Sequence, residues 1–85
     1  MKKVVVYTSP SCPYCVRAKE LLKRKNVPFE EKLIGWDDEA GWEEMRKKSG
    51  GMKTVPQIYI DDKLVGGYTD LAALDSAGKL EGMLQ

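Results

Sequence analysis

The strongest constraint on the fold is a pair of cysteines, Cys12 and Cys15, placed where an apolar strand pattern gives way to a helical one. Residues 4–7 form a β-branched run typical of a buried strand, and Pro13 suits the first helical position, where its missing N–H needs no partner. The first N–H groups of a helix and the positive end of its dipole favour a thiolate, the nucleophilic form of cysteine. Because Cys15 follows about one helical turn later, the two sulfurs can close a small disulfide, and the pair predicts redox chemistry.

Composition limits the classes to which the chain can belong. A length of 85 residues predicts one domain spanning residues 1–85. The net charge of +1 provides no field that would attract nucleic acid or an anionic membrane. The chain has no long apolar run and no signal-like segment, so we expect a cytoplasmic protein.

The cysteine pair has two alternative interpretations: it could be half of a zinc site, or two inert buried cysteines. Zinc requires four ligands, and the chain has no histidine and no third cysteine, so a site would need a symmetric dimer. We therefore expect no metal site.

The order of elements predicts an α/β fold. Strands are expected at residues 2–8, 29–34, 57–60 and 64–66, and helices at residues 13–25, 38–49 and 69–76, with a short helical turn at 79–84. The first two strands flank a helix and should be parallel, whereas the tight turn at residues 61–63 makes the last two an antiparallel hairpin. Asp37 or Asp38 is expected to cap the second helix and Thr69 the third. The result is a four-stranded mixed sheet flanked by three or more helices, which resembles the thioredoxin fold.

Three motifs together resemble the glutaredoxin family, in its dithiol class and small bacterial form. They are Cys12-Pro13-Tyr14-Cys15, Thr54-Val55-Pro56-Gln57 and Gly66-Gly67-Tyr68-Thr69-Asp70. The resemblance implies a glutathione-dependent thiol–disulfide oxidoreductase that reduces protein disulfides and glutathione mixed disulfides. In that reaction Cys12 attacks the disulfide, and Cys15 or a second glutathione resolves the mixed disulfide.

The resemblance also implies a glutathione groove, formed by Tyr14, Thr54, Val55, Pro56, Gln57, Gly67, Tyr68, Thr69 and Asp70. It implies a cis Val55–Pro56 bond, with the Val55 backbone free to pair with a cysteinyl peptide. The start of the third helix would receive an α-carboxylate, and Asp70 the adjacent ammonium. Glutathione is then a co-substrate and no cofactor is tightly bound. The partners are disulfide-bearing or glutathionylated proteins, and the protein is expected to be a monomer.

One position departs from the family pattern. Many glutaredoxins carry a basic residue three positions before the first cysteine, where this chain has Ser9. The candidate replacements are Arg46, Lys47, Lys48, Lys53 and Gln57. Trp36 and Trp42 are interpreted as core packing or a hydrophobic staple.

Two alternative functions stay open from the sequence. The first is a redoxin reduced by a thioredoxin reductase instead of glutathione, an interpretation that Ser9 favours and the motif of residues 66–70 opposes. The second is a glutathione-ligated iron–sulfur cluster carrier that dimerises through Cys12. Pro13 resembles the catalytic members more than the cluster carriers.

Overall fold

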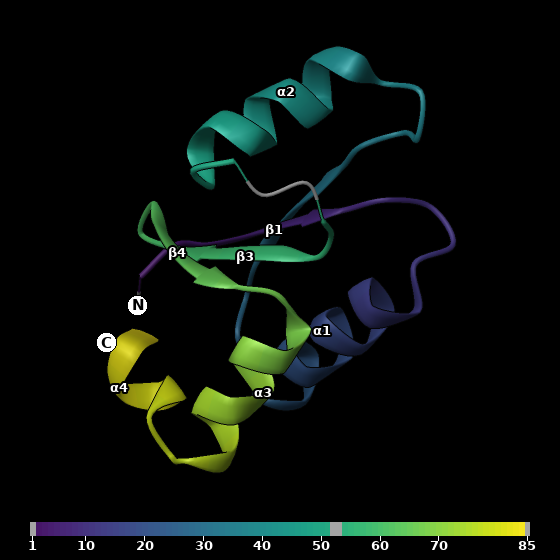
Figure 1. The fold of residues 1–85 in the computed structure, drawn as a ribbon. Helices are drawn as coiled ribbons and strands as arrows, with labels where there is room; N and C mark the ends of the chain where they lie inside the picture. Colours follow the sequence, from purple (N-terminus) through teal and green to yellow (C-terminus); the bar gives the residue numbers. More distant parts are fainter. Residues whose placement is uncertain (1, 52–53, 85) are drawn as a thin grey trace.

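A four-stranded sheet separates two helical layers in the computed structural model, which describes residues 2–51 and 54–84 (Figure 1). The elements in chain order are β1 (Val4–Thr8), α1 (Pro13–Arg24), β2 (Glu30–Leu33), α2 (Glu39–Lys48), β3 (Gln57–Ile60), β4 (Lys63–Gly66), α3 (Tyr68–Ser76) and α4 (Leu80–Leu84). The strand order is β2-β1-β3-β4, with β1 parallel to β2 and antiparallel to β3, and β3 antiparallel to β4. The predicted thioredoxin-type mixed sheet is confirmed.

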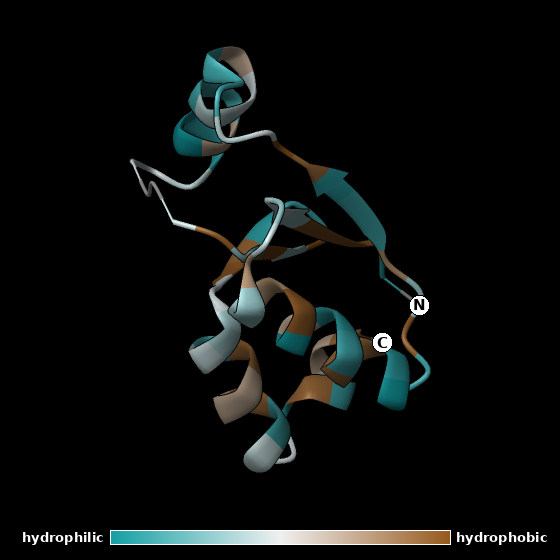
Figure 2. Ribbon diagram, turned by 90° about the vertical axis from the view of Figure 1, so that its right-hand side faces the viewer, coloured by the Kyte–Doolittle hydropathy of each residue, from teal (hydrophilic) through white to brown (hydrophobic). Residues whose placement is uncertain are grey.

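The strand β1 is buried along its whole length because helices cover both faces of the sheet. Its side chains alternate between the faces, as the two-residue period of a strand requires. Val4 and Val6 pack in the core beneath α1, α3 and α4, whereas Val5 and Tyr7 pack toward Met45 of α2. Figure 2 shows the hydrophobic strands at the centre and the largely hydrophilic β2 at the outside, where it forms one edge of the sheet.

Helix boundaries agree with the sequence to within a residue or two, but the capping residue of α3 differs from the prediction. Asp38 caps α2 by accepting the Gly41 N–H at 3.0 Å, as predicted. The prediction that Thr69 caps α3 is wrong, because the N-cap is Gly67 and the helix begins at Tyr68. Gly67 has no side chain, and the Asp70 carboxylate provides the cap instead by accepting the Gly67 N–H at 3.1 Å.

The hairpin between β3 and β4 turns at two residues in the left-handed region, Asp61 at φ 51° and Asp62 at φ 66°. Two such residues are typical of a tight hairpin turn, and alanine is strained there while glycine is not. We expect the Asp62→Gly variant to be more stable than Asp62→Ala by about 1 kcal/mol. Both variants lack the same carboxylate, so the difference in their urea midpoints measures the backbone alone. Equal midpoints would contradict this description of the turn.

Within residues 2–51 and 54–84, every helix is too short or too polar to cross a lipid bilayer.

Candidate active site

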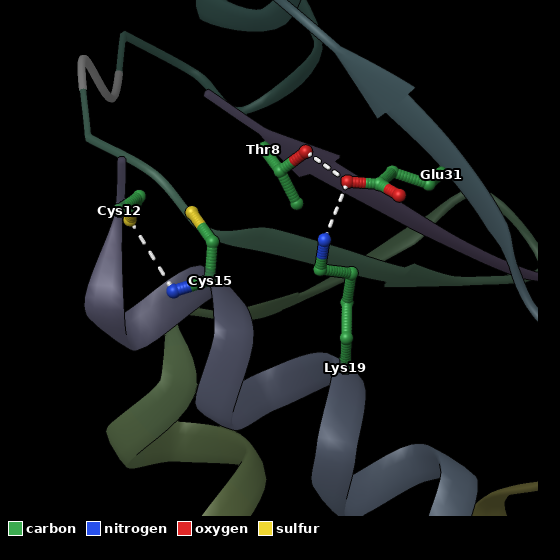
Figure 3. A network of polar contacts seen from close by, with 5 residues as sticks. All are labelled: Thr8, Cys12, Cys15, Lys19 and Glu31. Carbon is green, nitrogen blue, oxygen red and sulfur yellow. Dashed lines mark hydrogen bonds and ion pairs between the residues drawn. The ribbon is translucent and has the colours of Figure 1, made fainter. Parts of the chain in front are cut away.

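Cys12 is the N-cap residue of α1, at the junction of the β1 loop and the helix. Its sulfur accepts the Cys15 N–H at 3.2 Å (Figure 3), which is the contact that a capping oxygen usually makes. The Cys12 thiol also lies 3.8 Å from the Val55 carbonyl oxygen. The sulfur is partly exposed, and a helix N-terminus faces it. This is the setting that supports negative charge on a reacting sulfur.

Cys15 differs from Cys12 in its surroundings although both are free thiols. The Cys15 side chain is only 1 % exposed, on the inner face of α1. Burial, together with a smaller effect of the neighbouring Cys12, raises the pKa of the Cys15 thiol from 9.0 to about 12. Cys15 is therefore a protonated, shielded thiol at neutral pH when both cysteines are reduced.

A polar network ties the start of α1 to the sheet beside Cys15 (Figure 3). Glu31 of β2 accepts hydrogen bonds from Lys19 of α1 at 2.9 Å and from the Thr8 hydroxyl of β1 at 2.6 Å. These two donors lower the pKa of the Glu31 carboxyl, and the Lys19 charge slightly opposes the raised pKa of Cys15. The network fixes the first turns of α1 against the central strand.

A groove of about 250 Å³ opens beside Cys12, between the start of α1, the turn before β3 and the start of α3. The Val55–Pro56 peptide bond in that turn is cis, in agreement with the resemblance. Eight of the nine residues expected at a glutathione site line this groove: Tyr14, Thr54, Val55, Pro56, Gly67, Tyr68, Thr69 and Asp70.

Gln57 is the predicted groove residue that does not line the groove. Its side chain is fully buried, and its amide nitrogen donates to the Thr54 carbonyl oxygen at 2.8 Å and to the Thr54 hydroxyl at 3.1 Å. Gln57 pairs with Tyr7 in the sheet, so strand alternation turns it toward the α2 layer. It supports the shape of the turn from beneath.

Comparison with known proteins decides the family. A family model described as glutaredoxin matches residues 4–65. The chain is 49% identical to glutaredoxin 3 of Escherichia coli over 85 residues, with full coverage of both chains. This chain belongs to the glutaredoxin family. Glutaredoxins are thiol–disulfide oxidoreductases, and this one carries the cysteine pair of the dithiol class.

Solved glutaredoxin structures agree with the fold. The solution structure of the glutaredoxin from Brucella melitensis matches with a TM-score of 0.84 at 45% identity, covering 99% of this chain and 89% of that chain. A buckwheat glutaredoxin, crystallised as a complex with glutathione, matches with a TM-score of 0.85 at 27% identity, covering 98% of this chain and 76% of that one.

Two tyrosines line one side of the groove in this glutaredoxin, and an arginine lies over one of them. Tyr14 is 54% exposed, and its ring centroid lies 6.0 Å from that of Tyr68. The Arg17 guanidinium lies 5.2 Å above the Tyr14 ring. Arg17 follows Tyr14 by three positions on α1, the spacing at which two helical side chains can meet. A positive charge thus stands beside the groove without occupying the family's usual position.

That usual position is not an exposed site in this glutaredoxin, because Ser9 is only 4 % exposed. Two of the three candidate replacements on α2 are engaged elsewhere, since Arg46 pairs with Glu43 and Lys48 lies over the ring of Tyr7. The third, Lys47, is exposed. Lys53 falls outside the described residues. Across the described part of the chain, no group of three or more His, Cys, Asp or Glu side chains is placed to hold a metal ion.

Proposed function

We propose that this glutaredoxin uses glutathione to reduce protein disulfides and glutathione mixed disulfides, with Cys12 as nucleophile and Cys15 as resolving thiol. One observation carries the proposal: the Cys12 sulfur lies 3.8 Å from the Val55 carbonyl oxygen, which belongs to a groove that ends at the start of α3. The buckwheat relative, whose structure is a complex with glutathione, supports this assignment. The partners are then glutathione and disulfide-bearing or glutathionylated cytoplasmic proteins, and the protein acts as a monomer.

The reaction on a glutathionylated protein needs Cys12 alone. The Cys12 thiolate attacks the glutathione sulfur, the mixed disulfide breaks, and the protein thiolate leaves and takes up a proton. Cys12 is now disulfide-bonded to glutathione. A second glutathione thiolate attacks this bond, releases the Cys12 thiolate and departs as oxidised glutathione.

The reaction on a protein disulfide needs both cysteines. Cys12 bonds to one substrate sulfur and releases the other, and Cys15 then attacks the Cys12 sulfur and frees the second substrate thiol. Two glutathione molecules reduce the resulting Cys12–Cys15 disulfide and supply both electrons. Part of the raised pKa of Cys15 comes from the hydrogen bond and charge of Cys12. Both effects cease once Cys12 is in a mixed disulfide, so the pKa of Cys15 falls at that stage, whereas the larger effect of burial remains.

The groove offers complementary groups to each part of glutathione. The Val55 backbone, next to the Cys12 sulfur, suits the cysteinyl residue. The first turn of α3 has N–H groups that suit the α-carboxylate of the γ-glutamyl end, and the exposed Asp70 carboxylate suits its ammonium.

Asp70 provides a test in which charge and capping are separated. Asp70→Asn keeps an oxygen that can accept the Gly67 N–H but loses the charge, whereas Asp70→Ala loses both. A charge-assisted contact contributes about 1.5–3 kcal/mol, so both variants should lose about ten-fold or more in kcat/KM on a glutathionylated peptide. On the same peptide disulfide-bonded to Cys-Gly, which lacks the γ-glutamyl group, Asp70→Asn should remain near wild type.

A melting curve of each variant provides the control, because only Asp70→Ala should lose stability, by about 1 kcal/mol. If Asp70→Asn slows both substrates equally, Asp70 does not bind the γ-glutamyl ammonium, and that part of the proposal fails.

A further inference from the structure

A second hollow, of about 440 Å³, lies on α2 and the loop before it, and the proposed reaction does not use it. It is larger than the groove of about 250 Å³ beside Cys12. Its lining residues are Trp36, Glu39, Trp42, Glu43 and Arg46, and we call it the indole pocket.

The aromatic part of the indole pocket is preformed. The Trp36 and Trp42 rings stack with centroids 5.6 Å apart and planes 23° apart. Trp42 packs partly against the α2-side core, whereas Trp36 is 60% exposed, so its interpretation as core packing is wrong. Both indole N–H groups already have acceptors: the Pro10 carbonyl oxygen at 2.9 Å for Trp36 and the Gly35 carbonyl oxygen at 3.0 Å for Trp42. The rings therefore offer π-faces to a ligand and no spare donor.

The charged part of the pocket has an excess of negative charge. Arg46 and Glu43 form an ion pair within α2. Glu39 is exposed and makes no ion pair with another residue of the described chain. An unpaired carboxylate beside a tryptophan face is a combination that attracts a cation. A planar guanidinium fits it best, since it stacks on an indole and pairs with a carboxylate at once.

The indole pocket adjoins the catalytic loop. The loops that lead into α1 and α2 lie at the same end of the sheet (Figure 1), and the Trp36–Pro10 hydrogen bond joins them. Pro10 is two residues before Cys12, a backbone span of at most about 7 Å. A polypeptide whose disulfide reacts at Cys12 can therefore extend a neighbouring side chain to the pocket.

We propose that the indole pocket binds an arginine side chain of the disulfide-bearing protein substrate, close in sequence to the cysteine that Cys12 attacks. This inference rests on the proposed function, because it assumes that proteins are reduced at Cys12. It adds a preference among protein substrates that the glutathione groove does not provide.

The test uses short disulfide-bridged peptides with arginine at two, four or six residues from one cysteine, each matched by a peptide with citrulline, the uncharged isostere. Wild-type protein should favour arginine in kcat/KM by about five-fold for at least one spacing, the gain expected from one exposed cation–π contact and one exposed ion pair. Glu39→Gln should reduce the ratio to about two-fold or less, mainly by lowering kcat/KM for the arginine peptide. Trp36→Leu should also lose the preference for arginine over citrulline. Because both peptides react with the same variant, any effect of the substitution on the Pro10 loop cancels in the ratio of their kcat/KM values.

Glu44→Gln is the matched control, since it removes the same charge from an exposed α2 position that does not line the pocket. It should keep the arginine preference. The inference is overturned if arginine and citrulline peptides react equally well at every spacing, or if the arginine preference persists in Glu39→Gln. In either case the proposed function stands. Failure to reduce any of the peptides overturns the proposed protein-disulfide activity, and the inference with it.

Discussion

Replacing Cys12 with serine should reduce every disulfide-exchange activity of this protein to the uncatalysed rate. The only other thiol is Cys15, which is buried and whose pKa is raised to about 12. A hydroxyl at position 12 cannot attack sulfur at a useful rate, so no group remains to form the mixed disulfide. The loss should appear equally with glutathionylated peptides and with protein disulfides.

Replacing Cys15 with serine should instead separate the two activities. Protein-disulfide reduction should fall to background because no resolving thiol remains, whereas deglutathionylation should continue because external glutathione resolves the Cys12 adduct. Both rates are measured on the same preparations, with circular dichroism to verify folding. Equal loss of both activities in Cys15→Ser would contradict the one-cysteine route.

The reduced protein should react with iodoacetamide at Cys12 and leave Cys15 unmodified at pH 8. Burial raises the pKa of Cys15 from 9.0 to about 12, so its thiolate fraction at pH 8 is far below that of an ordinary cysteine, and burial also shields the sulfur from the reagent. Peptide mapping by mass spectrometry distinguishes the two sites. In Cys12→Ser the remaining effect is burial, so Cys15 should still react at least about ten-fold more slowly than in the same variant unfolded in guanidinium. Equal rates in the folded and unfolded variant would contradict the buried position of Cys15.

The same shift makes a prediction for stability at high pH. Because the folded pKa of Cys15 lies above the unfolded value, its contribution to stability is complete below about pH 9.0 and is lost as the pH rises to about 12. The free energy of unfolding should therefore fall less steeply between pH 9 and 11 in Cys15→Ala than in the reduced wild type. Parallel curves would show that Cys15 ionises alike in both states.

Most of the fold could be predicted from local sequence patterns. The β-branched run before Cys12 predicted β1 as a buried strand, and Val6 and Tyr7 are buried on opposite faces of it. Three local signals are found where they were expected: Pro13 begins α1, Asp38 caps α2, and two aspartates form the hairpin turn. These features depend on neighbours in the sequence, which is why they could be read without a structure.

Features set by tertiary contacts could not be predicted in the same way. The start of α3 is an exception, because Asp70 accepts the N–H of Gly67 only three residues earlier, and a Cβ at Gly66 would collide with the same carboxylate. Gln57 belongs to the groove motif, yet pairing with Tyr7 in the sheet points it into the α2 layer. Trp36 is exposed, and its indole N–H donates to the carbonyl oxygen of Pro10, in a loop far away in the sequence.

The central claim is that glutathione is the electron donor, and coupled turnover tests it most directly. NADPH consumption is followed with a protein disulfide as substrate, once with glutathione and glutathione reductase and once with thioredoxin reductase and no glutathione, with Cys12→Ser as the blank. We expect turnover proportional to protein concentration with glutathione and a rate equal to the blank with thioredoxin reductase. Turnover supported by thioredoxin reductase, with the glutathione system no faster than the blank, would contradict the claim.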